Sequence, residues 1–222
     1  MKRILLVGAS SSISQKFIER HSTDFNLIKM SRTNDYSDVS DFNIFDESTY
    51  FDDNLNFDGI IYFPGTINLK PFKRLNDKDF MDDFNINVVG LLKVLKFYEK
   101  KINKNSSVVL FGSVAANIGM PFHSSISISK GAILSLTRSL AAEWSPKIRV
   151  NCISPSLINT KMGSKFLSDE NMISRMNQKH PMQRVGRSED LSSLIHFLIS
   201  NESSWITGQN FNVDGGISTI KG

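Results

Sequence analysis

The chain has 222 residues, of which 40% are hydrophobic and 22% charged, with 13 Gly and 6 Pro. This composition excludes collagen-like, disordered and low-complexity proteins, and it leaves enough apolar material for one domain with a sizeable core. The formal net charge is only +4. The densest run of lysines, within residues 93–104, falls on the polar side of a predicted amphipathic helix. We therefore expect no nucleic-acid partner.

The single cysteine, Cys152, cannot form an internal disulfide bond, which favours a reducing compartment. The first apolar run, residues 4–7, is too short for the core of a signal peptide. No apolar run approaches the length of a membrane span. We therefore expect a cytoplasmic protein without a membrane partner.

The histidines show no i+3 or i+4 pairing and have no cysteine nearby, so the sequence predicts no metal site. They are His21, His123, His180 and His196.

Short aliphatic runs alternate with amphipathic segments along the chain. A strand over residues 4–7 is followed by a helix with Ile13 and Phe17 on its apolar side and Ser11 or Ser12 as its N-cap. Residues 33–53 are too rich in Asp, Ser and Asn for an assignment. The further strands are predicted over residues 26–30, 59–63, 108–111, 149–153 and 210–213, and the further helices over residues 80–101, 124–144 and 190–199. This alternation predicts a doubly wound, Rossmann-type parallel α/β sheet in a single domain, 1–222.

In such folds ligands bind beyond the carboxyl ends of the strands. Small or polar residues stand at these ends, so we expect them to converge on one nucleotide-sized site. The ends are residues 8–12, 31–32, 63–65, 112–113 and 154–160. The first of them, after Gly8, suits a pyrophosphate at a helix N-terminus, but taken alone it is equally explained as a serine-capped helix.

Read together, these strand ends resemble the short-chain dehydrogenase/reductase family, in particular its 3-oxoacyl reductase-like branch, over essentially the whole chain. The family's GxxxGxG glycines correspond to Gly8, Ser12 and Ser14, and its Asn-Asn-Ala-Gly strand end corresponds to residues 62–65. Its Tyr-x-x-x-Lys helix corresponds to residues 126–130. The most specific matches lie further on, at residues 148–155, Thr160, residues 207–209 and residues 213–216.

The resemblance implies an NAD(P) cofactor and a small-molecule carbonyl or alcohol substrate. It implies Ser113, Lys130 and Asn87 as catalytic residues, with Asn87 holding a water in a proton relay. An asparagine inside a helix equally bonds the neighbouring backbone, and Lys130 has a second reading as a salt-bridge partner. The implied cofactor-binding residues are Gly8, Ser10, Ser11, Ser12, Ile13, Ser31, Arg32, Asn43, Phe63, Pro64, Gly65, Lys130, Pro155, Ile158 and Thr160.

One departure from the family bears directly on catalysis. Ile126 stands where the family has the tyrosine that protonates the carbonyl oxygen, and loss of a general acid costs about 10²- to 10⁴-fold in rate. No tyrosine follows Tyr98, which argues against a slipped alignment. His123, one turn earlier, is the candidate substitute acid. A histidine near a helix start is also commonly a capping or surface residue.

Cofactor choice depends on the end of the second strand, where Ser31 and Arg32 offer one arginine and no acid. An arginine here accommodates the 2′-phosphate, so we expect NADP rather than NAD. The alternative is that Arg32 is a surface charge paired with Asp35. Three serines replace family glycines and would be strained if their φ angles were positive, which would weaken cofactor binding. They are Ser12, Ser14 and Ser156.

Residues 161–187 are expected to form a mobile substrate lid, whose methionines suit either an adaptable pocket or a helix core. Residues 205–216 resemble the family's oligomer-forming edge, which implies a homodimer or homotetramer. We expect an NADP(H)-dependent oxidoreductase without the tyrosine acid. The alternative is a nucleotide-binding protein of the same fold with little or no redox activity, serving as a sensor or assembly partner. A dehydratase or isomerase would need a base that we cannot identify.

Overall fold

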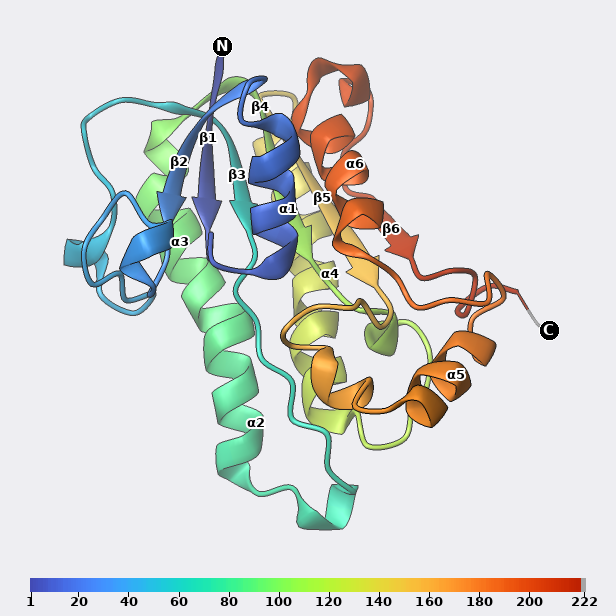
Figure 1. The fold of residues 1–222 in the computed structure, drawn as a ribbon. Helices are drawn as coiled ribbons and strands as arrows, with labels where there is room; N and C mark the ends of the chain where they lie inside the picture. Colours follow the sequence, from blue (N-terminus) through green and yellow to red (C-terminus); the bar gives the residue numbers. More distant parts are fainter. Residues whose placement is uncertain (221–222) are drawn as a thin grey trace.

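The computed structural model describes residues 1–220 of the chain (Figure 1). Its strands and helices alternate in the predicted way. The strands are β1 (Lys2–Val7), β2 (Phe25–Met30), β3 (Phe57–Tyr62), β4 (Ile102–Phe111), β5 (Ile148–Pro155) and β6 (Asn210–Val213). The helices are α1 (Ser12–His21), α2 (Asp77–Phe84), α3 (Gly90–Tyr98), α4 (Ser124–Trp144), α5 (Glu170–Gln178) and α6 (Ser188–Ile199).

The strands form one parallel sheet in the order β2-β1-β3-β4-β5-β6. The chain winds outward from β1 to β2 and then crosses to β3 on the other side of β1. This reversal makes the carboxyl ends of β1 and β3 a topological switch point, where doubly wound sheets bind their ligands. The predicted fold class is confirmed.

Helices cover both faces of the sheet, and each face has its own apolar core. Helices α1 and α6 pack together on one face, where Phe17 and Ile195 are fully buried (Figure 1). Helices α3 and α4 lie on the other face with Leu91 and Ile133 in its core. The inner strands β1, β3, β4 and β5 are largely buried between the two layers, which explains their aliphatic runs.

Local signals fixed several boundaries closely. Helix α4 spans the predicted residues, and Ser11 caps α1 by accepting a hydrogen bond from the Ser14 backbone N–H. The predicted helix over residues 80–101 is instead interrupted by a π-helical turn, Asn85–Val89. There the Asn87 side-chain amide donates to the carbonyl oxygen of Asp83, 2.7 Å away. This side-chain bond accompanies the wider turn.

The polar stretch of residues 33–53 forms two short 3₁₀ turns and no strand. Its aromatic residues nevertheless reach the core, where Phe42 and Tyr50 are buried and pack at a centroid distance of 5.6 Å. Within residues 1–220, no helix is both long and apolar enough to cross a bilayer.

Candidate functional site

The carboxyl ends of β1 and β3 meet at Gly8. Its φ is +81°, and a Cβ there would lie 2.9 Å from the Pro64 Cδ. Glycine is therefore required both for the backbone conformation and for the space. The backbone N–H groups of Gly8 and Ala9 both donate to the carbonyl oxygen of Met30 at the end of β2. Three strand ends are thus tied together at the switch point.

The first turn of α1 opens directly onto this junction. An α-helix leaves its first N–H groups without backbone partners, and they form a ready anion site. The backbone N–H of Lys161 donates to the Ser12 hydroxyl at 3.3 Å, and Ser14 Oγ is buried without a hydrogen-bond partner. Ser12, Ser14 and Ser156 do not have positive φ angles. The strain expected if those positions required a left-handed backbone therefore does not arise.

Lys130 and Asn87 converge beside Gly65, one residue beyond Pro64. A point at the Cβ position of Gly65 lies 3.1 Å from Asn87 Oδ1 and 3.5 Å from Lys130 Nζ. Lys130 Nζ donates to the carbonyl oxygen of Phe111 at 2.9 Å, while Asn87 Oδ1 is buried and accepts no hydrogen bond. A buried acceptor without a partner is uncommon in folded proteins. The glycine, the amine and this oxygen together outline a small polar recess.

Burial lowers the pKa of Lys130 to about 8, against the opposing influence of Cys152 and Asp83. The amine therefore loses its proton more readily than an exposed lysine does. Burial also raises the pKa of the Cys152 thiol to about 11, so this cysteine stays a neutral thiol.

Ser113 follows β4, whose last residue Phe111 accepts the hydrogen bond from Lys130, and it is half-buried. Its Oγ accepts a hydrogen bond from the Ala115 N–H at 3.2 Å, which leaves its own hydroxyl hydrogen for another acceptor. Ile126, at the position expected for the acid, is only 2% exposed and packs into the interior. His123 lies just before α4, and its Nδ1 is 2.7 Å from the carbonyl oxygen of Pro121. It makes no side-chain cap to the helix.

A buried carboxylate that links α2 to α4 was not predicted from the sequence. Asp83 is fully buried, and it receives hydrogen bonds from the Thr66 and Ser125 hydroxyls at 2.8 and 2.7 Å. The backbone N–H and side-chain amide of Asn68 also donate to it. Because Ser125 precedes Ile126, this network fixes the start of α4. Only the i−4 relation to Asn87 could have pointed to Asp83.

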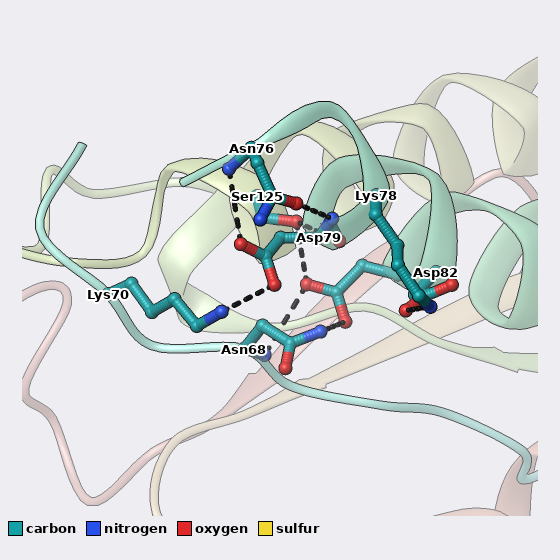
Figure 2. Close-up of polar contacts among 8 residues, drawn as sticks. Asn68, Lys70, Asn76, Lys78, Asp79, Asp82 and Ser125 are labelled. Carbon is teal, nitrogen blue, oxygen red and sulfur yellow. Dashed lines mark hydrogen bonds and ion pairs between the residues drawn. The ribbon is translucent and has the colours of Figure 1, made fainter. Parts of the chain in front are cut away.

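A second acidic residue of α2, Asp79, binds the segment that precedes the helix. Figure 2 shows Asp79 accepting from the Lys70 Nζ at 2.6 Å and from the Asn76 backbone N–H at 3.1 Å. Asn76 caps α2 in return by accepting from the Asp79 N–H at 3.0 Å. The ion pair with Lys70 lowers the pKa of Asp79, so it remains ionised. The segment before α2 is thereby held against the helix.

The profile of a family described as enoyl-(acyl carrier protein) reductase matches residues 49–218. That match covers more than half of the chain and includes the recess, Ser113 and Lys130. The chain belongs to the short-chain dehydrogenase/reductase family. Several of the proteins that it resembles are named as dehydrogenases or reductases.

Two relatives and one solved structure illustrate the range of short-chain proteins that the chain resembles. The chain is 30% identical over 152 residues to carbonyl reductase 2 (NADPH) of Sus scrofa, covering 67% of this chain and 62% of that protein. It is 38% identical over 122 residues to inactive 2-(S)-hydroxypropyl-CoM dehydrogenase 2 of Xanthobacter autotrophicus, covering 53% of each. A 4-hydroxyisoleucine dehydrogenase complexed with NADH superimposes over 100% of both chains, with 26% identity and a TM-score of 0.86. The chain spans about half the length of the first curated relatives, 41%, 52% and 53%.

Three further residues that the sequence predicted for a cofactor site follow β2. Arg32 is exposed just past β2, and within residues 1–220 no ion pair joins it to Asp35. Ser31 is buried and accepts from the Thr33 N–H. Asn43 is exposed, and its side chain accepts from the Phe45 N–H.

The β3 and β5 ends complete the set of predicted cofactor positions. Phe63 stacks on Phe111 with ring centroids 5.3 Å apart. Pro155 ends β5, and Ile158 is buried in the core under α1 and α6. Thr160 Oγ1 accepts from the Gly163 N–H at 3.1 Å, which starts the turn into the next segment.

Residues 161–187 are the segment expected to form a lid. They begin beside the α1 N-terminus, where the Lys161 N–H donates to the Ser12 hydroxyl. Further on, Lys165 Nζ donates to the carbonyl oxygen of Ile67 at 3.4 Å. The segment contains α5, which has no buried residue. Met162 and Met182 are exposed. The interpretation of these methionines as helix core therefore does not hold for those two.

Proposed function

We propose that the chain is an NADP(H)-dependent oxidoreductase that interconverts a small-molecule carbonyl and its alcohol. The observation that carries this proposal is the convergence of Lys130 Nζ and the partnerless Asn87 Oδ1 on Gly65, next to the switch point at Gly8. A buried acceptor and a titratable amine at one recess are what a proton relay requires.

The residues present fit a dinucleotide. When bound, the nicotinamide cofactor supplies the hydride that adds to the carbonyl carbon. The open first turn of α1, residues 10–13, would hold the pyrophosphate, with Gly8 allowing close approach. Arg32, exposed and without an ion pair to Asp35, would hold the 2′-phosphate, which favours NADP over NAD. Asn43 would meet the adenine. The residues assigned to the nicotinamide side are Phe63, Pro64, Gly65, Pro155, Ile158 and Thr160.

The chain's own residues would orient the substrate and move a proton. The Ser113 hydroxyl has a free hydrogen to donate to the substrate oxygen, which polarises the carbonyl. Lys130 would hold the nicotinamide ribose and a proton, and Asn87 Oδ1 would accept from a bridging water. These residues would deliver one proton to the substrate oxygen, which completes the alcohol.

Ile126 has no exchangeable proton, so that proton has to come from elsewhere. Two residues are proposed. Lys130 is supported by its pKa of about 8 and by its place in the recess. His123 is supported by its position one turn before Ile126, although one of its ring nitrogens already meets the carbonyl oxygen of Pro121.

The experiment is NADPH-dependent reduction of an aldehyde and ketone panel by the wild type, Ile126→Tyr, Ile126→Val and His123→Ala. The proposal predicts measurable wild-type turnover, a gain of about 10²-fold or more in Ile126→Tyr and no gain in the Ile126→Val control. Loss of activity in His123→Ala would identify the histidine as the acid. Thermal shifts with NADPH and NADH are measured in parallel, and no shift with either would overturn the proposal.

The rival function is a nucleotide-binding protein with little or no redox chemistry. The buried, unreactive Ile126 favours it, and one of the relatives is itself named inactive. Binding of NADPH with turnover only in Ile126→Tyr would establish this rival.

We further propose a homodimer or homotetramer in the cytoplasm. Trp205 is 98% exposed just before the edge strand β6, which suits burial against a second copy. Light scattering of the wild type and Trp205→Ser tests the assembly. The buried, unpaired Cys152 suits a reducing compartment.

A further inference from the structure

Two histidines and an aspartate from three different elements meet at the edge of the sheet where the strands begin. His21 ends α1, Asp24 directly precedes β2, and His196 lies in the last turn of α6. Helices α1 and α6 lie side by side over one face of the sheet (Figure 1). This edge is opposite the switch point at Gly8, so the cluster is separate from the proposed catalytic recess.

One nitrogen atom of each histidine lies near the same carboxylate oxygen. His21 Nδ1 lies 3.0 Å and His196 Nε2 lies 3.5 Å from the same oxygen, Asp24 Oδ2. One ligand atom from each of the three residues lies within 4.8 Å of the others. A tetrahedral zinc ion with bonds of about 2.0–2.2 Å holds its ligand atoms about 3.3 Å apart. The two measured separations fall on either side of that value.

Hydrogen bonding alone leaves this cluster incomplete. The Asp24 carboxylate satisfies His21 Nδ1, but His196 reaches it only at 3.5 Å. The second nitrogen of His21, Nε2, is buried and has no partner. Two imidazoles stacked 4.3 Å apart on one carboxylate are what a cation could bridge.

Aromatic neighbours keep both rings in place. Phe17 contacts the His21 ring at a centroid distance of 5.1 Å, and Phe25 contacts the His196 ring at 5.4 Å. This packing holds both imidazoles beside Asp24.

We propose that His21, Asp24 and His196 form a binding site for one divalent transition-metal ion of the zinc type. Imidazole nitrogens with one carboxylate suit Zn²⁺, Ni²⁺ or Cu²⁺, and three protein ligands leave room for water. The bound ion would join α1, the start of β2 and α6. The histidine spacing along the chain predicted no metal site, because it could not show that His21 and His196 become neighbours through the packing of two distant helices.

The test is isothermal titration of the purified, tag-free full chain with ZnCl₂, repeated with Co²⁺ while its visible absorption is followed. We expect one ion per chain and a cobalt band of a site with nitrogen and oxygen ligands. Zinc at about 100 times its Kd should raise Tm by roughly 5–10 °C. His196→Ala and Asp24→Ala should each weaken zinc binding by at least about 100-fold, more than outer partners of a metal site do. His123→Ala, outside the cluster, is the matched control and should bind zinc like the wild type.

Asp24 is exposed, so Asp24→Ala should remain folded even if His196→Ala does not. Histidine NMR of the wild type gives a second measurement, in which zinc should shift the His21 and His196 ring signals and leave those of His123 and His180. Absence of binding at millimolar zinc overturns the site. Unchanged affinity in Asp24→Ala with unshifted His21 and His196 signals also overturns it, because it shows adventitious binding only.

Discussion

Lys130 Nζ donates a hydrogen bond to the carbonyl oxygen of Phe111 at the end of β4, and within residues 1–220 this buried amine has no carboxylate partner. Desolvation of this charge is what brings the pKa of Lys130 down from 10.5 to about 8. Burial of Lys130 therefore lowers the free energy of unfolding. The position of its amine in the recess accounts for a lysine at this buried site.

Lys130→Met should stabilise the chain at neutral pH. Between pH 8 and 10.5 the unfolded state binds more protons than the folded state, so the free energy of unfolding of the wild type rises with pH across this window. The substitution removes the burial penalty but leaves the Phe111 carbonyl unpaired, a net gain on the order of 1–2 kcal/mol at pH 7. Urea unfolding at pH 7 and pH 10 measures it, and the gain should shrink at the higher pH. The exposed Lys96→Met is the control, and an equal pH trend in both variants would contradict the assignment.

Asp83→Asn should destabilise the hydrogen-bonded contact between α2 and α4. An amide offers one acceptor oxygen where the carboxylate receives donors on both, so some donors among Thr66, Asn68 and Ser125 are left unpaired. The expected loss is about 2–4 kcal/mol. Asp82→Asn, next to it on the helix surface, removes only the exposed ion pair with Lys78 and should cost about 0.5 kcal/mol. Thermal unfolding of the two variants compares them directly, and equal losses would refute the network's role.

Gly8→Ala and Gly131→Ala should shift stability in opposite directions. The first places a Cβ at a positive φ and against Pro64, which should cost at least about 2 kcal/mol. The second adds a methyl group within α4 where nothing lies within 4 Å, and it should gain about 1 kcal/mol from helix propensity. Denaturant midpoints report both changes. A neutral Gly8→Ala would show that the β1 turn is not the one described.

Arg32→Ala should separate the two cofactors. If Arg32 holds the 2′-phosphate, the Kd for NADPH rises at least about tenfold, equivalent to 1.4 kcal/mol, while the Kd for NADH stays the same. Fluorescence titration with each cofactor gives both constants. Arg74→Ala, an exposed arginine before α2, is the control. Parallel weakening of both cofactors would point to a general charge effect instead.

Most strands could be predicted because a strand buried on both faces is a short run of aliphatic residues. Most helices could be predicted from apolar residues at helical spacing. The run at residues 4–7 and the capped helix after it needed no tertiary information. Helix α5 was not assigned because its residues, none of which is buried, lie in the segment that was interpreted as a substrate lid. The strand β4 begins earlier than predicted because its first residues, from Ile102, are partly exposed and polar.

The site residues at the strand ends could be predicted from the sequence. The contacts that depend on how the helices pack against one another could not. Gly8 and Lys130 follow from motif spacing. The partnerless state of Asn87 Oδ1 and the four donors around Asp83 depend on how α2 meets α4, which no local pattern encodes. The same holds for His21 and His196, which only the pairing of α1 with α6 brings together.

The π-helical turn at Asn85–Val89 has a consequence for how this chain can change. A wide turn accommodates one residue more than an α-turn, and each residue rotates a helix by roughly 100°. Because the wide turn absorbs that extra residue, deleting a single residue there would relax the turn to α geometry and leave Asp83 beside Ser125 and α3 on the sheet. A deletion within the regular helix α3 has no wide turn to absorb it and would rotate one half of the helix against the other by roughly 100°. The π-helical turn should therefore tolerate the loss of one residue better than the regular helix that follows it.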